Sequence, residues 1–186
     1  MATISRKSEV GSRAPKIFLE AEVFLTLQHV ADLLARPVEE MLKVAGLSGT
    51  QYNVLRILRG AERGKQRVGE PNSENAVDFV GLACGEIAAR MITRDPDITR
   101  LLDRLEARGL VARLREKKDR RVVQARITAE GIQLLKKLDK PIEAMHRAQL
   151  AHVPAAHLRQ LLEHLKEIRS AVAQIKACAG NKEETI

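Results

Sequence analysis

Apolar residues recur with helical spacing over most of this chain, and only two short stretches alternate instead. In residues 98–105 the apolar side chains stand at i, i+3, i+4 and i+7, which predicts a helix with one buried stripe. Residues 111–115 and 122–127 alternate between apolar and polar positions, which predicts the two strands of a hairpin. We therefore expect a mainly α-helical fold with one small β-hairpin.

A second short helix precedes the helix over residues 98–105. Helix formers fill residues 86–91, and this helix should end before Pro96, because proline disfavours a helical conformation in the residue that precedes it. Asp95 is expected to cap the next helix, with Pro96 at its first position and Asp97 in its first turn. Gly109 should end that helix. Two short helices followed by a hairpin have the order of a winged helix-turn-helix, which predicts DNA as the partner.

The tip of the expected hairpin is basic and polar. Residues 116–120 read Glu-Lys-Lys-Asp-Arg, which cannot pack into a core and must face solvent or a polyanion. The whole chain has 32 Lys and Arg against 24 Asp and Glu, a formal net charge of +8. That charge agrees with a nucleic-acid partner, although many soluble proteins are basic and the order of the motifs carries more weight.

Helices are also expected on the N-terminal side of these motifs. Apolar residues recur through residues 18–44, where Pro37 marks a kink or a break. Ser48 and Gln51 have the spacing of a capping box at the start of the helix that follows. Residues 61–80 are rich in Gly, Pro, Asn and charged side chains, which predicts an exposed loop.

On the C-terminal side, Thr128 is expected to cap a helix that runs to about residue 151, and Pro154 to open a last helix. Apolar residues in the last helix recur at a spacing close to 3.5, and such a seam prefers a partner helix. A second copy of the chain is the economical partner. The seam consists of Leu158, Leu161, Leu162, Leu165, Ile168, Val172 and Ile175.

Composition limits the class of protein. The chain has 186 residues with no Trp, one Tyr and three Phe, so its core must consist of aliphatic side chains, which suits packed helices in one domain. Residues 1–16 lack the apolar run of a secretory signal, and no stretch reaches the length of a membrane span. We therefore expect a cytoplasmic protein without a membrane partner.

Motifs for catalysis, cofactors and metals are not found in the sequence. It has no GxSxG, P-loop or Rossmann fingerprint, so we expect neither an enzyme nor a bound cofactor. Cys84 and Cys178 are far apart and lack zinc-type spacing, and the five histidines form no compact cluster. Cys84 stands at the start of a helix, where it is either a buried inert thiol or a redox sensor.

Several ordered stretches resemble the MarR family of bacterial transcription regulators. Residues 98–111 resemble the recognition helix of that family and its exit, and residues 119–121 resemble its wing motif. Residues 127–131 are similar to the entry to its long fifth helix, and residues 47–58 to its second helix. The resemblance covers about residues 18–178.

This resemblance implies a winged helix-turn-helix with long N- and C-terminal dimerisation helices. Residues 1–16 would form a flexible basic tail, residues 17–47 and 128–180 the helical dimerisation region, and residues 48–127 the DNA-binding region, all in one interwoven domain. One departure from the family concerns the cap of the third helix, where Ala83 replaces the usual Ser or Thr, at a cost of about 1 kcal/mol.

A two-fold dimer would present its recognition helices about 34 Å apart, which fits successive major grooves and predicts a palindromic site. Arg100 is placed to bond a guanine edge, and the resemblance implies that Arg121 enters the minor groove while Asp119 orients it. Asp119 and Arg121 alternatively form an ordinary hairpin salt bridge. Asp103 is expected to neutralise a neighbouring arginine. The expected DNA-contacting residues are Arg94, Thr99, Arg100, Arg104, Lys117, Lys118, Asp119 and Arg121.

The expected function is that of a sequence-specific DNA-binding transcription regulator, a homodimeric repressor that a small apolar or phenolic effector releases from its operator. Proteins with this resemblance commonly bind effectors in a crevice between the dimer helices and the DNA-binding lobe. Two alternatives remain open: a redox-responsive regulator that acts through Cys84, and a winged-helix protein-interaction module that does not bind DNA.

Overall fold

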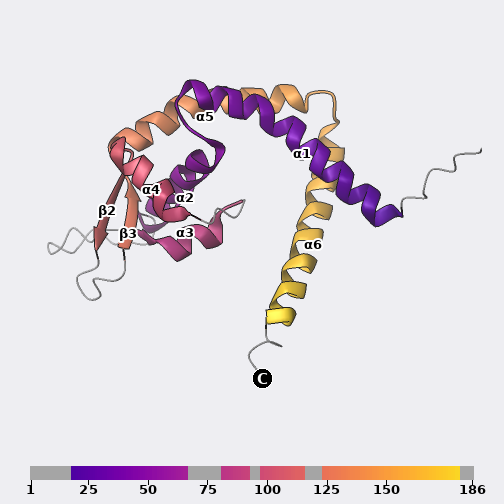
Figure 1. Ribbon diagram of the computed structural model, residues 1–186. Helices are drawn as coiled ribbons and strands as arrows, with labels where there is room; N and C mark the ends of the chain where they lie inside the picture. The colour runs from indigo at the N-terminus through magenta and orange to yellow at the C-terminus, as the bar shows by residue number, and fades with distance from the viewer. Residues whose placement is uncertain (1–17, 67–80, 93–96, 116–122, 181–186) are drawn as a thin grey trace, which may run out of the picture.

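A computed structural model describes residues 18–66, 81–92, 97–115 and 123–180. Helices α1 and α5 form an arch, with a lobe of the shorter helices and the strands under one end and α6 running down from the other (Figure 1). The elements, in chain order, are α1 (Leu19–Val44), α2 (Gly49–Gln66), β1 (Leu82–Ala83), α3 (Cys84–Arg90), α4 (Ile98–Ala107), β2 (Val111–Arg115), β3 (Val123–Ile127), α5 (Ala129–Gln149) and α6 (Ala155–Gly180).

Sequence analysis predicted a kink or a break at Pro37; helix α1 is continuous through this residue, so a break is excluded. Because a proline lacks the backbone N–H, one hydrogen bond of the helix is missing, and the turns on both sides keep their own hydrogen bonds. The helix ends at Val44. In the turn that follows, the Gly46 N–H donates to the carbonyl of Lys43 at 2.9 Å and the Leu47 N–H to that of Leu42 at 2.8 Å. Gly46 has a φ of +69°, which favours glycine at this C-terminus.

The predicted capping box of α2 is confirmed. The Ser48 N–H donates to Gln51 Oε1 at 3.0 Å, and the Gln51 N–H donates to Ser48 Oγ at 3.2 Å. Helix α2 then continues to Gln66, so the expectation of a loop is wrong for residues 61–66. One face of α2 packs on the core, which explains why the helix continues into this polar stretch. Residues 67–80 lie outside the described part of the chain.

The cap of α3 agrees with the sequence analysis, whereas the cap of α4 corrects it. Glu86 Oε2 accepts from the Ala83 N–H at 2.8 Å, so half of a capping box forms although Ala83 has no hydroxyl. Asp97, and not Asp95, caps α4: its Oδ1 accepts from the Arg100 N–H at 3.0 Å. The helix begins with Ile98, the first residue of the buried stripe, so Asp97 is the residue directly before it. Asp95 itself falls in an undescribed range.

The predicted hairpin is confirmed and gains a third strand. Strands β2 and β3 pair antiparallel from Val111 opposite Ile127 to Arg115 opposite Val123. Strand β1 adds to the other edge of β3, with Leu82 opposite Ala125, and gives the order β1-β3-β2. Two residues are too few to show an alternating pattern, which is why the sequence did not predict β1.

The core lies in the lobe, between α2, α4, the sheet and the first half of α5. All four residues of the predicted α4 stripe are buried: Ile98, Leu101, Leu102 and Leu105. Helix α5 begins as predicted, because Thr128 Oγ1 accepts from the Gly131 N–H at 3.1 Å. Gly131 lies against Leu110, which stands between α4 and β2; a Cβ here would come within 2.5 Å of the Leu110 carbonyl oxygen.

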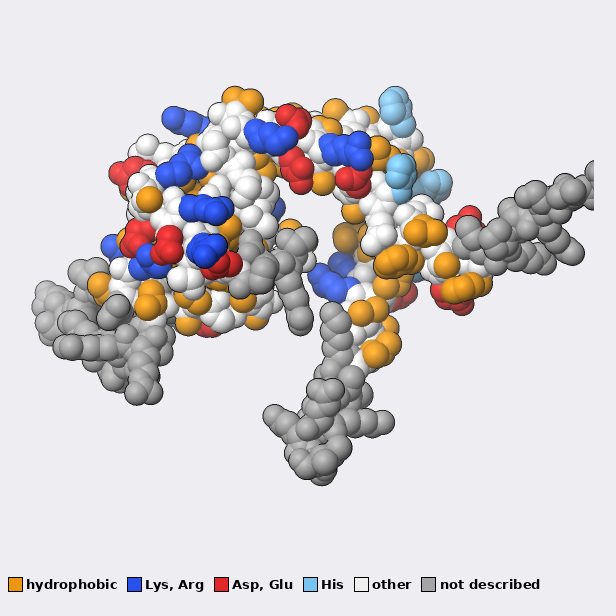
Figure 2. Space-filling view, viewed as in Figure 1, with side chains coloured by type: hydrophobic (Ala, Val, Ile, Leu, Met, Phe, Trp, Pro, Cys, Tyr) orange, Lys and Arg blue, Asp and Glu red, His pale blue; other side chains and the backbone are white. Residues whose placement is uncertain are grey.

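Apolar side chains outside the lobe are left uncovered. Figure 2 shows them over α6 and over the N-terminal half of α1. In α6, Leu161 and Leu162 are 50% and 51% exposed, and in α1 Phe24 is 58% exposed. Over the ranges that the structure describes, no helix is long and apolar enough to span a membrane.

Candidate nucleic-acid interface

Helix α4 turns one face outward from the lobe. Because its four buried apolar residues occupy the opposite stripe, Thr99, Arg100 and Arg104 are exposed on that outer face. These are three of the residues that the sequence predicted to contact DNA. The fourth predicted residue in this region, Arg94, lies outside the described residues.

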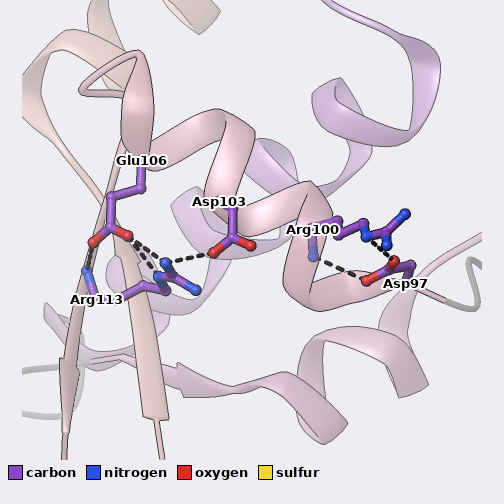
Figure 3. A network of polar contacts seen from close by, with 5 residues as sticks. All are labelled: Asp97, Arg100, Asp103, Glu106 and Arg113. Carbon is purple, nitrogen blue, oxygen red and sulfur yellow. Dashed lines mark hydrogen bonds and ion pairs between the residues drawn. The ribbon is translucent and has the colours of Figure 1, made fainter.

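Arg100 stands at the N-terminal end of α4 and is held there by Asp97 (Figure 3). Its Nε lies 3.0 Å from Asp97 Oδ2, while the side chain as a whole is 77% exposed. The ion pair uses Nε, so the two Nη groups are at the outer end of the side chain. Such a fork matches the O6 and N7 acceptors of guanine.

Arg113 of β2 links the hairpin to α4. Its Nη2 lies 2.6 Å from Asp103 Oδ1 and 2.5 Å from Glu106 Oε2, and its Nε donates to Glu106 Oε2 at 2.7 Å (Figure 3). These hydrogen bonds, chiefly those to Glu106, raise the pKa of Arg113 above its ordinary value. Asp103 is thus neutralised by an arginine, as expected. We call this set of Asp103, Glu106 and Arg113 the wing clamp.

The sequence missed the roles of Arg113 and Glu106. Arg113 was one polar position in an alternating strand, and nothing local showed which helix its side chain would meet. Strand β2 ends at Arg115 and β3 begins at Val123. The undescribed range between them contains Lys117, Lys118, Asp119 and Arg121. Their contacts with DNA therefore stay predictions.

Arg108, directly after α4, connects the lobe to the end of α1. Its Nη1 donates to the Gly46 carbonyl and its Nη2 to the Ala45 carbonyl, the latter at 3.3 Å. The last carbonyls of a helix have no partner within it, and a cation at that end is favoured by the helix dipole. The contact joins the C-terminal end of α4 to the end of α1.

A second connection joins α2 to α5. Arg59 Nη1 and Nη2 donate to the two carboxylate oxygens of Asp139 at 2.7 and 2.9 Å, and the Arg59 side chain is only 12% exposed. These hydrogen bonds hold the pKa of Asp139 below its ordinary value. Farther along α5, Gln149 Nε2 donates to the Leu34 carbonyl of α1 at 3.0 Å.

Two cavities lie where α1, α2 and α5 meet. The first, of about 860 Å³, has an apolar wall chiefly from α1 and a more polar wall from the start of α2, and it reaches Ile92. The second, of about 730 Å³, lies between α2 and α5 and is rich in arginine. Both are lined by Tyr52, Arg56 and His146. Gly46, which accepts the hydrogen bond of Arg108, also lines the first cavity.

Cys84 is the first residue of α3 and a free thiol, partly buried against the core. This position serves packing, and a redox role stays a prediction. Where the structure describes the chain, no group of three or more His, Cys, Asp or Glu is arranged to hold a metal ion.

Comparison with known proteins agrees with this geometry. The sequence model of the MarR family matches residues 47–123. The crystal structure of a MarR transcription factor from Planctomyces limnophilus is 37% identical, with 81% of this chain and 97% of that chain covered and a TM-score of 0.56. The HTH-type transcriptional regulator FarR of Neisseria gonorrhoeae is 27% identical over 155 residues, which cover 82% of this chain and 94% of FarR.

The fold is also that of S. aureus MepR, whose crystal structure is of a complex with DNA. The two chains are 18% identical, with 83% of this chain and 99% of the MepR chain covered and a TM-score of 0.62.

Proposed function

The chain belongs to the MarR family of DNA-binding transcription regulators, and from this we propose that it is a homodimeric repressor that binds a palindromic operator and releases it when an effector binds. The observation that carries the proposal is the outer face of α4. Its exposed Thr99, Arg100 and Arg104 project from a helix whose other face is fully buried in the lobe. A helix of this shape fits the major groove.

Within this proposal the bases are read from α4. Arg100 bonds a guanine edge through its Nη groups, and Thr99 and Arg104 contact neighbouring bases or phosphates. The wing clamp supports this reading by fixing the hairpin against α4, so that the two move as one unit.

The hairpin tip supplies the remaining contacts in the proposal. Lys117 and Lys118 meet phosphates, and Arg121 enters the minor groove with Asp119 orienting it. Arg94, in the connection before α4, binds bases or phosphates beside the recognition helix.

The homodimer is supported by the uncovered apolar side chains of α1 and α6. Ile168, Val172 and Ile175 of the predicted seam are 44%, 48% and 68% exposed. Burying a large aliphatic side chain stabilises a protein by about 1.5–3 kcal/mol. Covering this surface with a second copy therefore makes the free energy of association more favourable. The same association sets two α4 helices at the fixed separation that a palindrome needs.

Release by an effector is supported by the position of the first cavity. Its wall includes Gly46, which is bonded to Arg108 at the end of the recognition helix, and Ile92, next to the connection into that helix. An effector shifts an equilibrium only through different affinities for two states. A ligand here would favour a spacing of α4 relative to α1 that no longer fits the operator.

Selection of bound sequences from a random duplex pool tests the DNA-binding part of the proposal. We expect a palindrome with half-sites one helical turn apart, and an affinity for random duplex that falls steeply between low and moderate salt. An interaction module that does not use DNA would enrich no sequence and show almost no salt dependence.

A further inference from the structure

The outer face of α4 carries two arginines four residues apart, and their surroundings differ. Arg100 forms an ion pair with Asp97, whose Oδ2 lies 3.0 Å from the Arg100 Nε. Arg104 has no carboxylate within ion-pair distance among the residues whose side chains the structure describes. The other two carboxylates of this segment belong to the wing clamp (Figure 3). Only one of the two arginines on this face is therefore held by an acid.

The carboxylate that holds Arg100 is itself fixed to the helix. Asp97 Oδ1 accepts the backbone N–H of Arg100 at 3.0 Å, while Oδ2 meets the side chain of the same residue. The Asp97 carbonyl also accepts from the N–H of Leu101 at 3.1 Å, and Leu101 is buried in the lobe. One carboxylate thus joins the backbone and the guanidinium of Arg100, so the helix itself sets the position of that guanidinium (Figure 3).

The ion pair also decides which edge of the Arg100 guanidinium is presented. A guanidinium offers a fork of two donors either through its two Nη groups or through Nε and one Nη group. Because Asp97 occupies Nε, the fork of two Nη groups is the one that remains, and it matches O6 and N7 of guanine. A side chain that is ordered before binding loses less conformational freedom when it meets the base.

Phosphates gain less from Arg100 than a guanine does. Asp97 and Arg100 together carry no net charge, so the pair adds little to the attraction between a basic surface and any duplex. The acceptors of guanine are uncharged, and they bond to the Nη groups whether or not Nε is paired. Arg104 keeps its full charge and is the better phosphate ligand of the two.

We propose that Asp97 is a positioning residue that commits Arg100 to reading a guanine, whereas Arg104 binds phosphate. The proposal rests on the DNA-binding function above and gives separate tasks to two arginines of one helical face. Asp97 acts through Arg100 alone, so its loss reduces discrimination between bases without reducing affinity for DNA in general.

The change Asp97→Asn separates these tasks in the full-length protein. Asparagine caps a helix about as well as aspartate, so α4 stays folded while the ion pair is lost, and Asp97→Ser, a second good cap, should behave in the same way. We expect the ratio of operator affinity to random-duplex affinity to fall by about fivefold, at the base pair that Arg100→Ala also relaxes. Affinity for random duplex should rise, with a salt dependence steeper by about one unit, because Arg100 is then able to neutralise a phosphate.

Double variants supply the matched control. Asp97→Asn should leave the affinity ratio unchanged in the Arg100→Ala background and lower it by the same factor in the Arg104→Ala background. Base discrimination like that of wild type in Asp97→Asn, or a loss of discrimination that persists without Arg100, would overturn the role of Asp97 and leave the DNA-binding function standing. A wild-type protein that enriches no sequence from a random pool would contradict the DNA-binding function, and this proposal with it.

Discussion

The guanidinium of Arg108 donates a hydrogen bond to the carbonyl of Gly46, a residue 62 positions earlier in the chain. Arg108 directly follows α4, and Gly46 lies in the turn after α1. The bond therefore joins the helix that we propose meets DNA to the helix whose N-terminal half carries exposed apolar side chains. Gly46 is also in the wall of the first cavity.

Arg108→Ala should therefore affect operator binding more than it affects folding. The side chain is exposed and its partners are carbonyls, so we expect the free energy of unfolding to fall by only about 0.5–1.5 kcal/mol in urea denaturation. Operator affinity should fall further than affinity for random duplex, because α4 is less well fixed relative to α1. Arg147→Ala, which removes an exposed ion pair on α5, serves as the control. If both variants bind the operator like wild type, Arg108 only secures the fold.

Removal of Arg113 should release the wing from the recognition helix. Arg113→Ala leaves Asp103 and Glu106 close together without their cation, and both are partly exposed, so we expect a loss of about 1 kcal/mol in unfolding free energy. The effect on operator affinity should exceed the effect of Lys117→Ala, since the whole hairpin loses its position. Unchanged operator affinity in a folded Arg113→Ala protein would show that the wing clamp does not position the wing.

The Arg59 and Asp139 pair predicts a dependence of stability on pH. The pKa of Asp139 is lowered in the folded state, so the stabilisation is present above the unfolded pKa of about 3.9 and is lost as pH falls through the folded value. Asp139 is 41% exposed, so screening limits the effect to about 1 kcal/mol. With Asp139→Asn, the free energy of unfolding should depend less on pH in the acid range than it does with the control variant Glu143→Gln. An unchanged acid limb would mean that the pair contributes nothing.

Truncation before Pro154 tests the homodimer. Loss of α6 removes the apolar seam that includes the exposed Leu161 and Leu162, so light scattering should report a monomer or an aggregate, without specific operator binding. The milder double change Leu161→Ser and Leu162→Ser, at two exposed positions, should weaken association while the lobe stays folded. A truncated protein that remains a dimer with full operator affinity would contradict the proposed role of α6.

Local patterns in the sequence predicted a large part of the fold. The stripe over residues 98–105, the Ser48 cap and the Thr128 cap depend on residues three or four positions apart, and all three are confirmed. The choice between Asp95 and Asp97 as cap was wrong because both can accept from a nearby N–H, and only the packing of Ile98 decides where the helix begins.

The long-range contacts could not be predicted from local patterns. Arg108, Arg113 and Arg59 are polar positions on helices and a strand, and their sequence context is that of many solvated arginines. Each finds its partner only after the elements pack: Arg108 on α1, Arg113 on α4 and Arg59 on α5. For the same reason, the shared position of Arg56 in two cavities appears only in the folded chain.

We expect α4 to read the edges of the bases, whereas the lysines of the hairpin tip supply affinity without reading sequence and Arg121 responds only to the width of the minor groove. Lys117→Ala should weaken binding to operator and random duplex alike, and should make the salt dependence shallower by about one unit for each phosphate that the variant no longer neutralises. Arg121→Ala should lose most affinity where the flank of the operator is rich in A·T, and Asp119→Ala should resemble it in milder form.

Titration of Arg100→Ala against the selected operator and a random duplex is the most direct test. Arg147→Ala, which removes an exposed ion pair on α5 away from α4, is the control. We expect Arg100→Ala to lose about 1–3 kcal/mol on the operator, to relax the preference at one base pair per half-site, and to bind random duplex nearly as wild type does. An equal loss on both duplexes would contradict base reading by α4.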